Sequence, residues 1–101
     1  DVRCALATKA SKLVASGLGK PESYMMVVVQ DNASILFGGT DEPAAYLELN
    51  SIGLPSGKTK ELSQELCRLM EGELSLPPSR IYIVFRDVER PHWGWNGSTF
   101  G

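Results

Sequence analysis

The residues that most often carry chemistry are sparse in this chain. The single histidine, His92, lies in a Pro-His-Trp turn, without the serine, cysteine or aspartate spacing of a catalytic triad and without a second metal ligand. The adjacent carboxylates Asp41 and Glu42 have polar neighbours, which favours a solvated loop over acid or base chemistry. The pair Gly38-Gly39 leads into Thr-Asp-Glu-Pro rather than a phosphate-binding loop. These patterns predict turn and surface roles and no metal site.

Composition places the chain among ordinary globular domains. Its 101 residues are 43% hydrophobic and 22% charged, with a net charge of −2, which predicts one domain over residues 1–101 and no nucleic-acid partner. No apolar run approaches the roughly 20 residues that span a bilayer, so no membrane partner is expected. Cys4 and Cys67 lack metal-ligand spacing and are expected to be free thiols in a reducing compartment. We therefore expect a cytoplasmic protein, with export without a signal peptide as the alternative.

The elements that must position any site follow from the apolar spacing. Apolar residues recur at three- and four-residue steps from Val2 to Leu18 and again from Leu62 to Leu74, which predicts two amphipathic helices. Strands are predicted over residues 24–30, 35–37, 44–52 and 81–85, each bounded by turn residues. The tail, HWGWNGSTFG, is expected to form a short strand and an ordered turn.

An internal repeat organises these elements. LGKPESYMMVVVQD at residues 18–31 and LSLPPSRIYIVFRD at residues 74–87 match at five of fourteen positions with an offset of 56, where chance would give about one. The second copy is preceded by a strand and a helix, and the first only by its helix. We therefore expect a strand before Asp1 that this sequence does not contain.

Tandem strand-helix-strand units predict an α+β fold, in which two βαβ units form a four-stranded mixed sheet with both helices on one face. The runs MMVVV and IYIVF are apolar at every position, which is typical of strands buried on both sides. Because no further helix is available to cover the second face, we expect a closed symmetric homo-oligomer. An aggregating fragment is the alternative explanation of the same pattern.

One known family shares these patterns over nearly the whole chain. The sequence resembles the macrophage migration inhibitory factor and D-dopachrome tautomerase family in six segments, in the family's order: GKPESYMMV, FGG, EPAAY, NSIG, PPSRIYI and WGWNGSTF. The resemblance implies a homotrimer with active sites at subunit boundaries, no metal or organic cofactor, and keto-enol tautomerisation of phenylpyruvate-like acids. The family's base is an N-terminal proline whose amine pKa is lowered by an apolar pocket. That proline would precede Asp1, so no catalytic base is present in this sequence.

The resemblance also assigns binding roles. Lys20 would hold a substrate carboxylate, Ser51 and Ile52 would border the proline with the Ile52 N–H available to a carboxylate oxygen, and Tyr82 would pack on the substrate ring of the adjacent subunit. From pattern alone, Lys20 would be a solvated lysine and Tyr82 a core aromatic, and residues 51–52 are equally a strand end. The expected pocket rim is Trp93, Trp95 and Phe100, whose alternative is a tail folded back as core.

Two departures from the family bear on function. Val84 replaces an asparagine that binds phenolic hydroxyl groups, which favours unsubstituted phenylpyruvate, and Ala44 and Leu47 replace a C-x-x-C pair, so no redox activity is expected. Tautomerisation is thus the leading hypothesis. The alternatives are a cytokine-like protein that binds a receptor without turnover, and a truncated product that does not fold alone.

Overall fold

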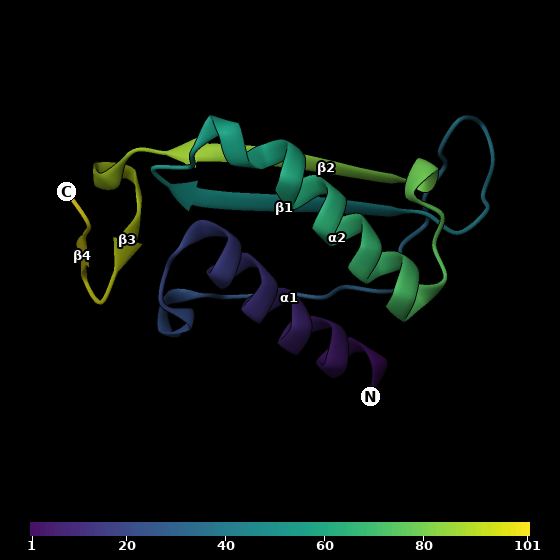
Figure 1. Ribbon diagram of the computed structural model, residues 1–101, viewed down its shortest axis with the longest axis horizontal. Helices are drawn as coiled ribbons and strands as arrows, with labels where there is room; N and C mark the ends of the chain where they lie inside the picture. The colour runs from purple at the N-terminus through teal and green to yellow at the C-terminus, as the bar shows by residue number, and fades with distance from the viewer.

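The computed structural model describes residues 1–101 and has two long helices and two long strands. Helix α1 is Val2–Leu18, strand β1 is Ala45–Ile52, helix α2 is Thr59–Leu74 and strand β2 is Ile81–Val88. A terminal hairpin of β3, Gly94–Trp95, and β4, Ser98–Thr99, closes the chain (Figure 1). The predicted helices, the two strands of the second unit and the short strand with its turn in the tail are therefore present.

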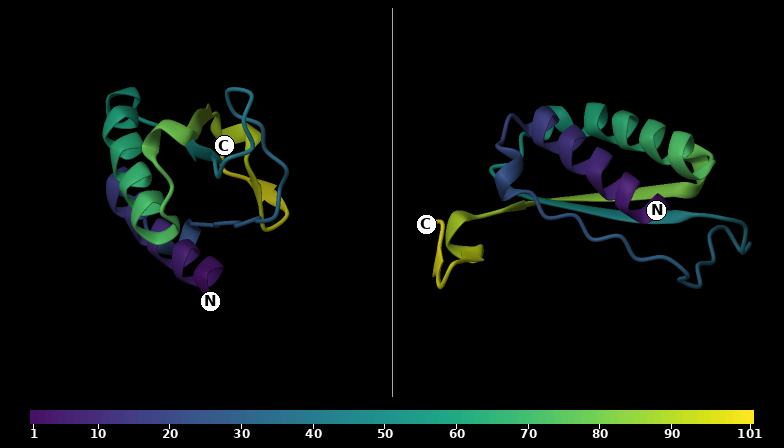
Figure 2. Two further views of the ribbon diagram at one scale, coloured as in Figure 1. Left: turned by 90° about the vertical axis from the view of Figure 1, so that its right-hand side faces the viewer. Right: turned by 90° about the horizontal axis from the view of Figure 1, so that it is seen from below.

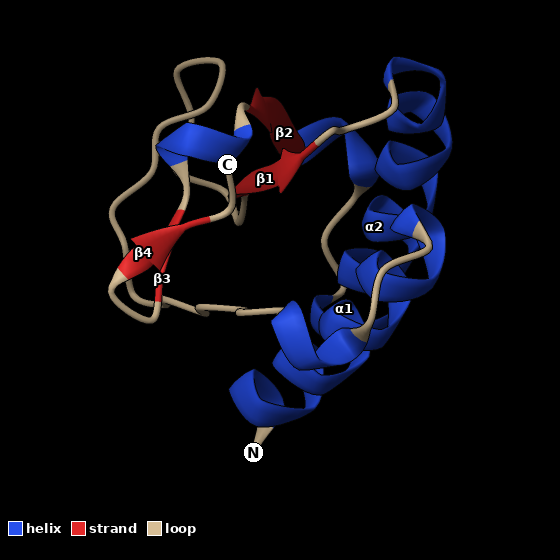
Figure 3. Cartoon of the chain, turned by 90° about the vertical axis from the view of Figure 1, so that its left-hand side faces the viewer, coloured by secondary structure: helices blue, strands red, loops and turns tan.

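The second strand-helix-strand unit forms a parallel pair. Strands β1 and β2 pair in one register from Ala45 opposite Ile81 to Ile52 opposite Val88, and α2 makes the crossover between them. Both long helices lie on the same side of this sheet, and the opposite side carries no helix (Figures 2 and 3). The α+β class and the placement of both helices on one face are as predicted.

The repeat reappears as repeated local geometry. Helices α1 and α2 end at Leu18 and Leu74, each followed by a residue in the left-handed region, Gly19 at φ 65° and Ser75 at φ 57°. Three-residue 3-10 turns follow at Glu22–Tyr24 and Pro78–Arg80, again at an offset of 56. The sequence repeat thus encodes the same helix end and the same turn twice.

The two copies differ after the turn. Residues 81–88 form β2, whereas the matching segment, residues 25–31, is extended but belongs to no strand, and residues 35–37 contribute only a bridge between Phe37 and Thr40. No backbone hydrogen bond involves residues 26–36. The segment runs beneath α1 along the direction of β1 without pairing to it (Figure 1). Of the predicted four-stranded sheet, only β1 and β2 are therefore paired in this chain. Residues 25–31 remain unpaired because a β-ladder requires an adjacent strand.

The core lies between the helices and the sheet. Two clusters of buried residues fill it: Leu6, Met70, Leu76 and Ile81 in one, and Val14, Leu49, Leu62 and Leu66 in the other. The helices approach closely at Gly17, where an added Cβ would lie 2.7 Å from the Leu62 side chain. Only 10 of 101 residues are buried, so this core is thin for a domain of this length.

The opposite face of the sheet and the extended segment leave large apolar side chains uncovered. Met26 is 86% exposed and Val28 72%, while their neighbours Met25 and Val29 pack against the core clusters. Glu48 and Arg86 form an ion pair on the outward face of the sheet. The hydrogen bond to Glu48 and the negative charge of Glu48 raise the pKa of Arg86. The fully apolar runs thus alternate between a covered face and an open one, which is what a chain that needs further partners would show.

Candidate active site

The turn that follows α1 positions Lys20. Gly19 adopts φ 65°, ψ 35°, a conformation that favours glycine, and its N–H donates to the Ser16 carbonyl at 3.2 Å. The N–H of Lys20 donates to the Ala15 carbonyl at 2.9 Å, which completes the helix end. Lys20 is half-buried, and its Nζ donates to the carbonyl oxygen of Ile52, 32 residues away in sequence. The fold therefore brings together two of the residues singled out from the sequence.

The C-terminal end of β1 supplies the residues that contact the Lys20 ammonium group. Ser51 is buried, and its Oγ donates to the Ile52 carbonyl at 3.2 Å, so this oxygen accepts from both Ser51 and Lys20. The chain then turns at Gly53, φ 63°, and the Leu54 N–H donates to Oδ1 of Asp87 at 3.0 Å. The contact to Lys20 is made by the Ile52 carbonyl, whereas the sequence directed attention to its N–H.

This arrangement can bind an anion. A neutral carbonyl is a weaker partner for an ammonium group than a carboxylate, since charge-assisted hydrogen bonds are about twice as strong as neutral ones. The Nζ of Lys20 is ordered by the Ile52 carbonyl but paired with no carboxylate. A substrate carboxylate could therefore exchange for, or add to, the contact with Ile52.

An aromatic cluster includes a residue of the turn that follows Lys20. The rings of Trp95 and Phe100 stack with centroids 5.8 Å apart, and Tyr24 meets both edge-on, at 6.2 and 6.1 Å. Tyr24 belongs to the 3-10 turn that begins two residues after Lys20, so one loop supplies both the cation and an aromatic wall. Aromatic pairs in such geometries add about 0.5–1.5 kcal/mol beyond their buried area.

Tyr24 is the residue that sequence reasoning missed. It stands four positions after Lys20 and was counted as the start of a strand. Trp93, predicted to share the rim, contributes its backbone, because its carbonyl accepts the Phe100 N–H at 3.2 Å. The indole of Trp93 is half-buried and is not among the stacked rings.

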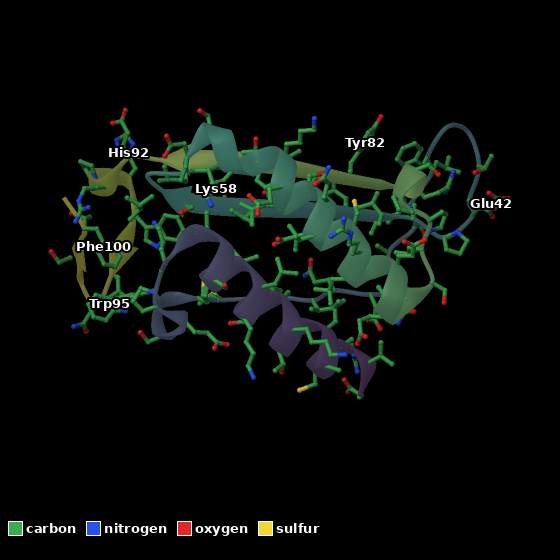
Figure 4. The ribbon with its side chains drawn as sticks, in the orientation of Figure 1. Glu42, Lys58, Tyr82, His92, Trp95 and Phe100 are labelled. Atoms are coloured by element: carbon green, nitrogen blue, oxygen red, sulfur yellow. The ribbon has the colours of Figure 1, made fainter.

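Tyr82 lies elsewhere. It is the second residue of β2 and pairs with Tyr46, whereas Ile52 pairs with Val88 at the other end of the sheet. Six residues of strand separate the two positions, which is about 20 Å. Figure 4 shows Tyr82 far along the molecule from Trp95 and Phe100. One chain therefore does not bring Tyr82 to the Lys20 site.

The remaining reactive side chains form no second site. His92 is exposed in the 3-10 turn Arg90–His92, beside the terminal hairpin (Figure 4). Cys4 and Cys67 are free, and no three His, Cys, Asp or Glu residues gather as metal ligands. No helix of the structure is both long and apolar enough to cross a membrane.

Fold and site together describe a small α+β protein in which one turn supplies both a lysine without a carboxylate partner and a ring of an aromatic cluster. The family model for macrophage migration inhibitory factor (MIF) matches residues 1–101. A MIF homologue of Brugia malayi is 41% identical over 102 residues, covering 100% of this chain and 89% of that protein. The mouse factor is 36% identical over 94 residues, covering 92% of this chain and 82% of that protein.

Solved structures agree. The MIF homologue from Prochlorococcus marinus superposes with a TM-score of 0.94 at 44% identity, covering 98% of this chain and 88% of that one. The MIF of Toxoplasma gondii gives 0.88 at 32% identity, with the same coverage. The chain belongs to the MIF family, whose members have tautomerase and cytokine roles.

Proposed function

We propose that this chain is one subunit of a homotrimeric keto-enol tautomerase acting on phenylpyruvate-like acids. The observation that carries the proposal is the contact of Lys20 with the end of β1, made from a turn that also supplies Tyr24 to the aromatic cluster. An ammonium group and an aromatic cluster to which the same turn contributes match a substrate that is both a carboxylate and an aromatic. Val84, an apolar residue two positions after Tyr82 on the open face, favours unsubstituted phenylpyruvate over hydroxylated analogues.

The trimer is supported by two features of the chain. Met26, Val28, Tyr46 and Tyr82 expose a large apolar surface on the helix-free face, and burying it requires other copies of the chain or a different partner. Tyr82 is also too far from Lys20 to serve the same site within one subunit. A closed symmetric ring would solve both problems, because each subunit would give Tyr82 to the next.

The base would be an N-terminal proline on a strand preceding Asp1. Residues 26–36 make no backbone hydrogen bond, and β1 is paired only with β2, so both leave backbone groups free to pair with a further strand. Its first residue would lie near Lys20 and Ile52. Its proline nitrogen would remove a proton from the carbon next to the ketone, and the C–H electrons would form the enol double bond. The protonated amine would then return the proton to the carbonyl oxygen and become neutral again. Lys20 would hold the carboxylate throughout.

The test uses the protein extended upstream of Asp1 so that proline is its first residue, and compares it with the chain from Asp1 to Gly101. Loss of the phenylpyruvate enol absorbance should be accelerated only by the extended protein. Lys20→Ala should lower kcat/KM, and Lys12→Ala, on the exposed side of α1, should not. An extended protein without acceleration, or an unaffected Lys20→Ala variant, would disprove the proposal.

A second candidate function follows from the cytokine role within the family. In this alternative the same trimer binds a protein receptor and turnover is dispensable. A tautomerase-dead variant that retains partner capture at wild-type strength would favour it, and loss of capture would favour the enzyme. For either role we propose a cytoplasmic protein, with leaderless export required if the receptor is extracellular.

A further inference from the structure

A single arginine holds the loop at the far end of the sheet. The guanidinium of Arg80 donates four hydrogen bonds to backbone carbonyls of residues 37–43: Nε to Pro43 at 3.2 Å, Nη1 to Phe37 at 2.9 Å, and Nη2 to Glu42 at 2.8 Å and Thr40 at 3.4 Å. None of its partners is a carboxylate. Arg80 therefore acts as a clamp that fixes the backbone of this loop. The rigid fork of a guanidinium can bind several carbonyls at once in this way, and a lysine cannot.

The clamp fixes the Phe37 ring. The guanidinium carbon of Arg80 lies 5.1 Å from the ring centroid, within the range of a cation–π contact. The backbone of Phe37 is also paired with Thr40 through hydrogen bonds of 3.0 and 3.2 Å. Phe37 is thus held by its carbonyl, its backbone bridge and its ring face.

Phe37 in turn supports Tyr82. The two ring centroids are 4.7 Å apart with an angle of 33° between the planes. Tyr82 is 64% exposed, so most of its surface is free and this contact restricts its orientation. Arg80 thus contacts the Phe37 ring, and the Phe37 ring contacts the exposed phenol ring of Tyr82.

We propose that Arg80 and Phe37 are positioning residues that fix the Tyr82 ring for the active site of a neighbouring subunit. The inference rests on the proposed function and adds two residues to it, neither of which contacts the substrate. In each shared site, Arg80 and Phe37 belong to the subunit that donates Tyr82, whereas Lys20 belongs to the subunit that receives it. The two groups of variants should therefore complement one another in mixed trimers.

The experiment mixes subunits of the extended protein. Arg80→Lys keeps the charge and loses the fork, and Phe37→Leu keeps an apolar side chain and loses the ring. Each alone should raise KM for phenylpyruvate about threefold to tenfold with kcat little changed, the size expected for one misplaced aromatic contact. Arg3→Lys, a matched change at an exposed arginine on α1, should alter neither constant.

Complementation in mixed trimers then tests whether Arg80 acts in the subunit that donates Tyr82. When Lys20→Ala and Arg80→Lys subunits are unfolded together and refolded at equal amounts, about a quarter of the sites combine an intact Lys20 with an intact clamp. The mixture should exceed the mean of its two parents several-fold at low substrate concentration. Arg80→Lys mixed with Tyr82→Ala should show no gain, because both changes lie on the donating side.

The outcomes separate the two levels of the proposal. A gain for Lys20→Ala with Tyr82→Ala, but none for Lys20→Ala with either Arg80→Lys or Phe37→Leu, would overturn the positioning role and leave the shared site intact. No gain for Lys20→Ala with Tyr82→Ala would overturn the shared site and the positioning role together. Unchanged kinetics in both Arg80→Lys and Phe37→Leu would also overturn the inference.

Discussion

Replacing Val28 by aspartate should abolish assembly and leave the fold of the subunit unchanged. Val28 is 72% exposed in the single chain, on the side of the extended segment that faces away from the helices. Surface substitutions of this kind change the free energy of unfolding by within about 0.5 kcal/mol. The same position would become covered in the proposed trimer. The substitution should therefore weaken assembly strongly and leave the free energy of unfolding of the subunit nearly unchanged.

The size of the effect follows from the exposed surface. Covering the remaining side chain of a valine stabilises by about 1–2 kcal/mol, since full burial of such a residue contributes about 1.5–3 kcal/mol. An unpaired carboxylate in the same place adds a desolvation cost of several kcal/mol. Each subunit should therefore lose about 4 kcal/mol or more of assembly free energy, and a trimer contains the change three times.

Sedimentation equilibrium measures the mass, and circular dichroism with urea unfolding measures the subunit fold. Val2→Asp is the matched control, because Val2 is 57% exposed on α1 and receives the same substitution away from the sheet. We expect trimers for the parent and the control, and folded monomers for Val28→Asp. A trimeric Val28→Asp protein, or a parent that is monomeric at high concentration, would refute the reasoning about the open face.

Three further substitutions test the core and the site. Leu62→Ala should cost about 2–5 kcal/mol in urea unfolding, because Leu62 is 1% exposed and fills the contact between the helices. Asp87→Ala should cost about 1 kcal/mol and lower kcat/KM by freeing the turn after Ile52, whereas Asp87→Asn keeps an acceptor for the Leu54 N–H and should be milder. Tyr24→Leu should raise KM for phenylpyruvate about threefold to tenfold and leave unfolding within about 1 kcal/mol of the parent.

Local sequence was sufficient for the helices and turns. The apolar stripes end at Leu18 and Leu74, and the structure ends both helices there, because the signals for a helix end lie within a few residues of it. The repeat predicted matching turns, and both are 3-10 turns of three residues. Features decided by neighbours in sequence could therefore be predicted from the chain alone.

Strand pairing could not be predicted in the same way. Residues 25–31 and 81–87 share their pattern and follow the same turn, yet only the second segment forms a strand. The difference lies in the partner, since β1 offers its edge to β2 and no strand in this chain reaches residues 26–36. An extended apolar run indicates a capacity for pairing, and the ladder itself requires a second strand in place.

One contact of the candidate site joins two residues singled out from the sequence, and their binding roles stay predictions. Lys20 and Ile52 were chosen through a family resemblance, and the fold brings them into contact. The contacts of Tyr24 with Trp95 and of Arg80 with the loop before β1 join segments 71 and about 40 residues apart, for which spacing gives no signal. Packing between distant segments is visible only once the fold is known.

The open face and the divided site have one physical origin. Ile52 on β1 and Tyr82 on β2 lie near opposite ends of the eight-residue parallel pair, so no rotation of side chains can close about 20 Å between them. The same two strands expose Tyr46 and Tyr82 on a face that no element of the chain covers. In the proposed trimer, the neighbour that covers this face would also be the one that delivers a tyrosine to Lys20. Burial of apolar surface and completion of the site would then be one event, and variants that block assembly should lose activity in proportion to the trimer they lose.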